Sequence, residues 1–168
     1  MGLRSQPRSR TIGPSVLLPD VNVFVYAFRA DVPHHIEYRT FLQDRLAGDE
    51  PVGVSEAVLS SVVRITTNHR IFVEPSSLRR ALDFCNAVLT TPAAIPVRAG
   101  SRHWALFTGL CVDGGASGNL VPDAYLAALS LEQGATLVTS DRGMHRWPGV
   151  TIVHPLDGDI PPRGGRTA

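Results

Sequence analysis

The stretch VPDAYLAALSLEQGATLVTSD, residues 121–141, contains the pattern of a helix, a turn and a strand in succession. Pro122 suits the first turn of a helix, where its missing N–H has no helical partner to lose. The apolar residues that follow predict a helix running to Glu132. Gly134 is typical of a helix C-cap because glycine adopts left-handed backbone angles without strain. The apolar run 135–139 is the clearest strand in the chain.

Short apolar strands alternate with helices over the rest of the sequence as well. Such short runs are typical of strands buried on both faces of a parallel sheet, with helices covering those faces. The predicted fold class is therefore α/β with three layers: a central, mainly parallel sheet flanked by helices. The further predicted strands are 15–19, 51–54, 94–97 and 150–153, and the further predicted helices are 21–29, 34–47, 55–67, 76–91 and 101–112.

Length and composition predict a single domain with two loose ends. A chain of 168 residues with 43% apolar and 18% charged residues fits one globular core. Residues 1–14 are polar and contain Gly and Pro, which predicts a flexible N-terminal segment. Residues 157–168 (DGDIPPRGGRTA) predict a disordered C-terminal tail. The domain proper is thus expected at 15–156.

Charge and cysteine content restrict the class of protein further. The net charge is +1, although all 16 basic residues are arginine, so bulk charge does not indicate a nucleic-acid binder. Cys85 and Cys111 have neither C-x-x-C nor Cys/His zinc spacing, which favours buried thiols in a reducing compartment. The first 15 residues do not fit a signal peptide, and no apolar run reaches the ~18 residues of a membrane span. We therefore expect a cytoplasmic protein that is not in the membrane.

Three aspartates follow predicted strands or begin a predicted helix. Asp20 comes directly after the first strand, Asp141 follows the strand 135–139, and Asp123 lies in the first turn of its helix. Each has a structural alternative, since Asp favours turns and complements the helix dipole. In parallel sheets, however, ligands bind beyond the carboxyl ends of the strands. We therefore expect the three carboxylates at one edge of the sheet.

Crowded carboxylates repel one another, and a divalent cation relieves that repulsion. Oxygen ligands suit Mg²⁺ or Mn²⁺. Mg²⁺ often binds only one or two protein carboxylates and keeps several of its waters, which leaves room for a substrate phosphate. The chain contains neither the G-x-S-x-G motif of a serine hydrolase nor a phosphate-binding G-x-x-x-x-G-K-[ST] loop. These observations favour a bound metal ion that polarises a phosphoryl oxygen and makes a bound water more acidic.

Three segments resemble VapC-type toxins of the PIN-domain family. LLPDVNVFVYAF (17–28) is similar to their opening strand and Asp-x-Asn, and residues 121–150 resemble their closing helix, strand and Thr-x-Asp loop. VLSSVVRITTNHRIF (58–72) is similar to the middle of one branch of the family. The resemblance implies a PIN fold, Mg²⁺- or Mn²⁺-dependent RNA cleavage that inhibits growth or translation, a homodimer, and neutralisation by a VapB-type antitoxin.

The resemblance also implies roles for single residues. Asp20, Asp123 and Asp141 match the first, third and fourth acidic positions of the family. Asp20 and Asp123 would hold the metal, and Asp141 would complete the acidic pocket directly or through a water. Asn22 and Thr139 match the polar residues beside these acids, and Asn22 would orient Asp20 or a water.

The second acidic position of the family has no clean match. Ser60 and Ser61 stand where the family usually places a glutamate, and the only acid nearby is Glu56 at the start of the helix. Glu56 either supports the pocket through a water or meets the positive end of the helix dipole. This departure leaves open an alternative function: a PIN-fold protein that binds RNA or a partner but cleaves weakly or not at all.

Further candidates flank the acidic residues. Arg142 and Arg146 either meet RNA phosphates or belong to a solvated loop. Trp104 and Trp147 are candidates for stacking bases, although the apolar neighbours of Trp104 predict a core position. A haloacid-dehalogenase-like phosphatase is disfavoured, because that chemistry needs a second Asp where Asn22 stands.

Overall fold

The computed structural model describes residues 16–158, which form one parallel five-stranded sheet. Every pairing is parallel: Leu17 lies opposite Val52 on one side, and Pro19 lies opposite Val138 on the other. The prediction of a parallel α/β sheet is confirmed. The strands are β1 (Leu17–Pro19), β2 (Val52–Val54), β3 (Ala94–Pro96), β4 (Thr136–Val138) and β5 (Thr151–Val153). They lie side by side in the order β3-β2-β1-β4-β5.

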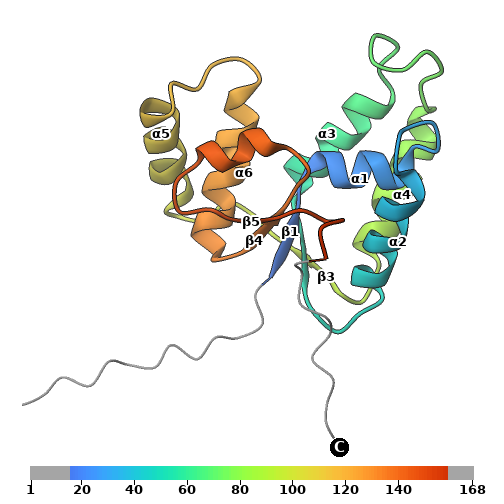
Figure 1. The fold of residues 1–168 in the computed structure, drawn as a ribbon, viewed down its shortest axis with the longest axis horizontal. Helices are drawn as coiled ribbons and strands as arrows, with labels where there is room; N and C mark the ends of the chain where they lie inside the picture. The colour runs from blue at the N-terminus through green and yellow to red at the C-terminus, as the bar shows by residue number, and fades with distance from the viewer. Residues whose placement is uncertain (1–15, 159–168) are drawn as a thin grey trace, which may run out of the picture.

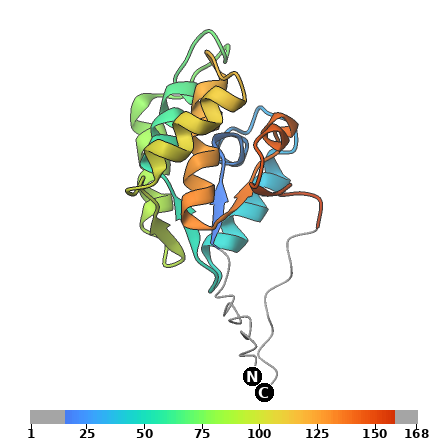
Figure 2. The ribbon, with the colours of Figure 1, turned by 90° about the vertical axis from the view of Figure 1, so that its left-hand side faces the viewer.

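Helices cover both faces of the sheet. Figure 1 shows α5 and α6 together on one side and α1, α2 and α4 on the other, and Figure 2 shows α5 and α6 in front of the sheet. The helices are α1 (Val21–Phe28), α2 (His35–Leu46), α3 (Glu56–Thr66), α4 (Leu78–Leu89), α5 (His103–Asp113) and α6 (Leu120–Gln133), with a 3₁₀ helix η1 (Arg142–Arg146) between β4 and β5.

The strand order explains this division and locates a crevice. The chain passes from β1 to β2 to β3 in one direction, then returns through α5 and α6 to β4 on the other side of β1. Because parallel crossovers are right-handed, the reversal places the last helix pair on the opposite face. The carboxyl ends of β1 and β4 therefore flank a topological switch point, where open parallel sheets bind ligands.

The core is formed by strands that are buried on both faces and by helices packed against them. All three residues of β1 and of β2 are buried. Leu18, Leu137, Phe24 and Leu129 are completely inaccessible to solvent. No helix in the part of the chain that the structure describes is long and apolar enough to cross a membrane.

The core position predicted for Trp104 is wrong, and the stacking candidate Trp147 is buried. Trp104 was expected in the core, but it is 71% exposed, whereas Trp147 is only 2% exposed. Helix α5 packs principally against α6, burying His103 and Leu110, so its outer surface stays in solvent despite its apolar sequence. Trp147 instead lies directly against Gly114 at the end of α5.

The predicted terminal segments fall largely outside the described residues. All of the predicted flexible segment 1–14 and residues 159–168 of the predicted C-terminal tail lie there. Asp157 and Gly158, which the prediction assigned to that tail, are described. Asp157 approaches His154, with its Oδ1 3.4 Å from the Nδ1 of the histidine.

Candidate active site

Asp20 occupies the carboxyl end of β1 and begins helix α1. Its backbone is extended and its side chain caps the helix: Oδ1 accepts a hydrogen bond of 2.6 Å from the Val21 amide. Oδ2 accepts hydrogen bonds from Thr139 Oγ1 at 2.7 Å and from Asn22 Nδ2 at 3.2 Å. Asp20 as a whole is only 7% exposed. Asp20 is therefore held in a fixed orientation at the switch point.

Asn22 and Thr139 connect the ends of β1 and β4. Asn22 Nδ2 donates to Thr139 Oγ1 at 3.0 Å, and the Ser140 amide donates to Asn22 Oδ1 at 3.4 Å. Thr139 Oγ1 also accepts from the Asp141 amide at 3.0 Å. Two short polar side chains thus position both Asp20 and the start of the loop that carries Asp141.

Asp123 faces Asp20 from the first turn of α6. Burial, together with the negative charges of Asp20 and Asp141, raises its pKa from 3.8 to about 6, against a smaller lowering by Arg146. Burial likewise raises the pKa of Asp20, although the Thr139 and Val21 hydrogen bonds oppose it. The negative charges of Asp20 and Asp141 thus raise the pKa of Asp123, and that of Asp141 raises the pKa of Asp20.

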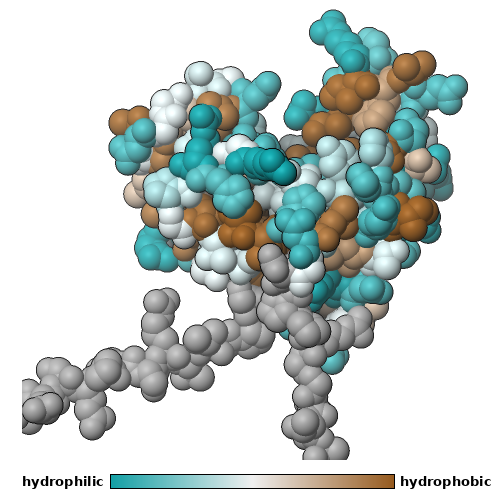
Figure 3. Space-filling view, viewed as in Figure 1, coloured by the Kyte–Doolittle hydropathy of each residue, from teal (hydrophilic) through white to brown (hydrophobic). Residues whose placement is uncertain are grey.

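A cavity of about 270 Å³ contains Asp20 and Asp123. Its walls come from α3 on one side and from α5 and α6 on the other, and Figure 3 shows the surface hollowed between these two parts of the molecule. The cavity is also lined by Ser55, Ala57, Val58, Ser61, Phe107 and Tyr125.

Asp141 lies beside this cavity rather than in it. It is exposed, it caps η1 by accepting a hydrogen bond of 2.7 Å from the Gly143 amide, and it lines an adjacent polar cavity of about 150 Å³. Arg142 lines the same polar cavity, and Arg146 is the cation that acts on Asp123. The structure therefore brings Asp20 and Asp123 together and places Asp141 at their edge.

The residues present fit a divalent cation held by two carboxylates. Within residues 16–158 no three His, Cys, Asp or Glu side chains are grouped closely enough to hold a metal. Mg²⁺ needs only one or two protein carboxylates, with water and substrate phosphate completing its shell. The raised pKa values of Asp20 and Asp123 show that their negative charge is unfavourable here without a counterion.

Glu56 forms an ion pair with Arg98 and does not face the two aspartates. Arg98 Nη2 donates a hydrogen bond of 2.8 Å to Glu56 Oε1, both side chains are 68% exposed, and Glu56 does not line the acidic cavity. Ser61 does line it, and its Oγ donates to the Ala57 carbonyl oxygen at 3.1 Å. The position that faces the two aspartates from α3 is therefore occupied by a serine.

Sequence reasoning missed the aromatic part of the cavity wall. Phe107 and Tyr125 both line the cavity, with ring centroids 5.9 Å apart. Both follow an apolar residue in a mainly apolar helix, as ordinary core residues do, so no signal in the sequence distinguishes them.

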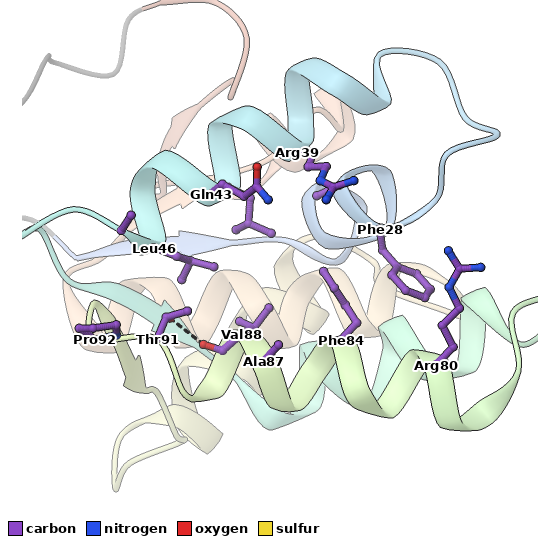
Figure 4. Close-up of a pocket in the computed structure, with 13 residues that line it drawn as sticks. Phe28, Arg39, Gln43, Leu46, Arg80, Phe84, Ala87, Val88, Thr91 and Pro92 are labelled. Atoms are coloured by element: carbon purple, nitrogen blue, oxygen red, sulfur yellow. Dashed lines mark hydrogen bonds between the residues drawn. The ribbon is translucent and has the colours of Figure 1, made fainter.

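A second, larger cavity lies between α1, α2 and α4. It has a volume of about 660 Å³ and mainly apolar walls, to which Phe28, Leu46 and Phe84 contribute. Figure 4 shows Arg39 of α2 and Arg80 of α4 at the same end of the groove as Phe28, and the Arg80 guanidinium lies 5.7 Å from the Phe28 ring. The groove therefore combines apolar walls with two arginines.

Comparison with solved structures gives the same fold. The chain superposes with a TM-score of 0.59 on VapC20 of Mycobacterium tuberculosis, described as a sarcin-ricin-loop-cleaving toxin, at 16% identity over 83% of this chain and 99% of the other. The TM-score is 0.58 with Rickettsia felis VapBC2 bound to a promoter DNA fragment, at 21% identity and 83% and 98% coverage. These similarities establish the fold.

Sequence comparison establishes the family. The PIN-domain family model matches residues 17–150. The chain is 45% identical to Mycobacterium bovis VapC ribonuclease Mb2897 over 143 residues, covering 85% of this chain and 97% of the relative. It is 39% identical to Mycobacterium tuberculosis ribonuclease VapC25 over 140 residues, covering 83% and 99%. The chain therefore belongs to the PIN-domain family and, within it, to the VapC ribonucleases.

Proposed function

We propose that this protein is the toxin of a type II toxin–antitoxin system and hydrolyses RNA phosphodiester bonds with Mg²⁺ or Mn²⁺. The observation that carries the proposal is the pairing of Asp20 and Asp123 in one cavity at the switch point of the sheet. Among residues 16–158, no arginine or histidine forms an ion pair with either carboxylate. A divalent cation would supply the missing positive charge.

The residues around the cavity have separate tasks in this proposal. Asp20 and Asp123 hold the cation, which when bound polarises a phosphoryl oxygen and makes a water more acidic. Thr139 and Asn22 keep the Asp20 carboxylate in place through the hydrogen bonds described above. Asp141 completes the acidic pocket from its edge, directly or through a water.

Arg142 and Arg146 supply positive charge on the η1 side of the acidic cavity. Both side chains are exposed on η1, next to Asp141. In the proposal they contact RNA phosphates that flank the cleaved bond, which fixes the position of the strand without reading its sequence.

The metal requirement is tested by cleavage of total RNA by purified protein, with mapping of the new 5′ ends. We expect no cleavage in chelator and recovery with Mg²⁺ or Mn²⁺. Asp20→Asn and Asp123→Asn should each lose at least about a hundredfold in rate, ~2.7 kcal/mol of barrier. Asp83→Asn, an exposed position on α4, is the matched control. Undiminished cleavage in chelator would refute the metal-dependent mechanism.

We further propose a VapB-type antitoxin as partner. Solved neighbours include VapBC structures from Rickettsia felis and from nontypeable Haemophilus influenzae. On this chain, an antitoxin Arg or Lys at Asp20 and Asp123 would form charge-assisted hydrogen bonds and compete with metal. Its apolar segment would fit the groove between α1, α2 and α4, with acidic residues meeting Arg39 and Arg80.

The partner proposal predicts a specific loss of affinity. The double variant Asp20→Asn/Asp123→Asn should bind the co-expressed antitoxin more weakly than wild type in matched salt. Equal affinity would exclude an antitoxin cation in the cavity.

We also propose a homodimer, for which light scattering should give twice the 18.1 kDa chain mass.

One observation favours the alternative of a binding protein with weak cleavage: Ser61 occupies the place in the cavity wall where a third carboxylate would face the metal. Single-turnover cleavage separates the two functions. A protein that binds RNA tightly but shows no metal-stimulated cleavage, with a wild-type fold by circular dichroism, would be the binder.

A further inference from the structure

Three aromatic side chains form a continuous row from solvent into the acidic cavity. The ring centroids of Trp104 and Phe107 are 5.5 Å apart, with an interplanar angle of 46°, and those of Phe107 and Tyr125 are 5.9 Å apart. Phe107 and Tyr125 line the cavity that holds Asp20 and Asp123, whereas Trp104 is 71% exposed. We call these three residues the aromatic row.

The inner part of the row is held rigidly by a buried histidine. His103 Nε2 lies 3.0 Å from the Tyr125 carbonyl oxygen, so the ring nitrogen donates and ties α5 to α6. The His103 ring is nearly parallel to that of Phe107, at 11° and 6.2 Å, and its centroid lies 4.3 Å from that of Tyr125. The cavity-facing rings are therefore positioned before any ligand arrives.

Trp104 has no comparable structural task. The packing of α5 against α6 buries His103 and Leu110, and the indole lies outside it. A large aromatic side chain that remains in solvent beside a catalytic cavity is available for a ligand. Its position in the row means that a ligand on Trp104 would be continuous with one in the cavity.

The opposite wall of the cavity leaves room for a flat group. Helix α3 and the residue before it contribute only small side chains there, those of Ser55, Ala57, Val58 and Ser61. A planar ring can therefore lie against Phe107 without displacing a bulky side chain from α3. The combination of aromatic faces on one side and carboxylates that bind a phosphate through a cation matches the two halves of a nucleotide.

We propose that Trp104 and Phe107 stack an unpaired nucleobase of the RNA adjacent to the phosphate in the acidic cavity. The proposal rests on the ribonuclease function argued above. Stacking on an aromatic face accepts every base but requires that the base be unstacked from its neighbours, as in loops and single strands. The aromatic row thus selects looped or single-stranded RNA over duplex.

The test uses a variant of the exposed residue, because it should leave the fold intact. In an Asp20→Asn background that does not cleave, binding of a fluorescein-labelled single-stranded RNA is measured for Trp104→Ala, Trp104→Phe and Val112→Ala. Val112 is an 80% exposed apolar residue of α5 that is not in the aromatic row, so it is the matched control. Circular dichroism checks each fold.

Trp104→Ala should weaken the binding of single-stranded RNA by roughly fivefold to more than a hundredfold, the factor that corresponds to loss of one stacked base. Trp104→Phe should retain most of the affinity, and Val112→Ala all of it. With Asp20 intact, Trp104→Ala should raise KM far more than it lowers kcat. Acrylamide quenching of the exposed Trp104 should also decrease when RNA is added, whereas the buried Trp147 gives a constant background.

Other results would overturn the proposal. RNA affinity and KM unchanged in Trp104→Ala would exclude stacking, and a simultaneous loss of the dimer by light scattering would assign the surface to a second copy of this chain. A loss limited to antitoxin binding would assign it to that partner. If the wild type neither binds nor cleaves RNA with any divalent metal, the ribonuclease function itself fails, a result distinct from these.

Discussion

Thr139 Oγ1 donates a 2.7 Å hydrogen bond to Asp20 Oδ2, joining the ends of two strands that are 119 positions apart in sequence. This bond acts against the burial that raises the pKa of Asp20. Because the same hydroxyl accepts from the Asp141 amide, one threonine controls the charge of one aspartate and the position of another.

Thr139→Val should shift the acidic limb of the pH–rate profile to higher pH. Without the hydroxyl, the carboxylate of Asp20 loses a stabilising hydrogen bond. Its pKa therefore rises further, and the carboxyl group ionises only at a higher pH. We expect kcat/KM to fall roughly tenfold at neutral pH, which is ~1.4 kcal/mol and within the range of a hydrogen bond to a charged group. Thr139→Ser should keep the wild-type profile. An unshifted profile in Thr139→Val would show that the bond does not govern ionisation.

Asp123→Asn should stabilise the metal-free protein at neutral pH while abolishing cleavage. Folding raises the pKa of Asp123 from 3.8 to about 6, so the folded state binds the proton more tightly than the unfolded chain. The stability of wild type therefore falls as pH rises from 4 through 6. The gain in Tm of Asp123→Asn should be full above pH 6 and disappear towards pH 4, measured in chelator. The exposed Asp83→Asn should show no such gain, and a pH-independent difference would contradict the shift.

Ser61→Glu should lower the Mn²⁺ concentration needed for half-maximal cleavage. Ser61 lines the cavity with Asp20 and Asp123, so a glutamate there adds a third carboxylate and strengthens the attraction for a cation. We expect a change of about tenfold, ~1.4 kcal/mol of metal binding, with a lower Tm in chelator because like charges repel. Ser60→Glu is the control, since Ser60 is exposed and does not line the cavity. Equal effects at both positions would mean that Ser61 does not face the metal.

Glu56→Gln should have little effect on cleavage, less than about tenfold, or ~1.4 kcal/mol of barrier. Its carboxylate pairs with Arg98 at the surface, and such exposed ion pairs contribute about 0–1 kcal/mol to stability. Arg98→Gln should therefore change the free energy of unfolding by the same small amount. A loss for Glu56→Gln as large as that for Asp20→Asn would identify Glu56 as a metal ligand.

Gly114→Ala should destabilise the fold by ~1–3 kcal/mol, the usual cost of overpacking. A Cβ at Gly114 would lie 2.6 Å from Trp147 Cζ3 and 2.9 Å from the Leu110 carbonyl oxygen, and Trp147 is too deeply buried to move away. Gly109→Ala, inside α5 and with nothing within 4 Å of the added Cβ, should instead stabilise by up to ~1 kcal/mol. Urea denaturation measures both. Similar free energies of unfolding for the two variants would show that Trp147 does not restrict the side chain at position 114.

The elements of the fold could be read from the sequence because they depend on local rules. The predicted strand at 135–139 is observed as β4 (Thr136–Val138), and Gly134 caps α6 with left-handed angles as expected. The helix itself begins at Leu120, two residues before the proline taken as its start. Apolar periodicity and special residues such as Gly and Pro determine these features within a few positions of the chain. The aspartates at strand ends were found in the same way.

The arrangement of the site was decided only by the tertiary structure. The strand order placed Asp20 and Asp123 in one cavity and Asp141 in the next, and it paired Glu56 with Arg98. The exposure of Trp104 and the burial of Trp147 also followed from packing. A helix that is apolar on all sides, as α5 is, does not specify which side its neighbours will cover. That choice depends on how distant segments fill space together, and no local pattern contains it.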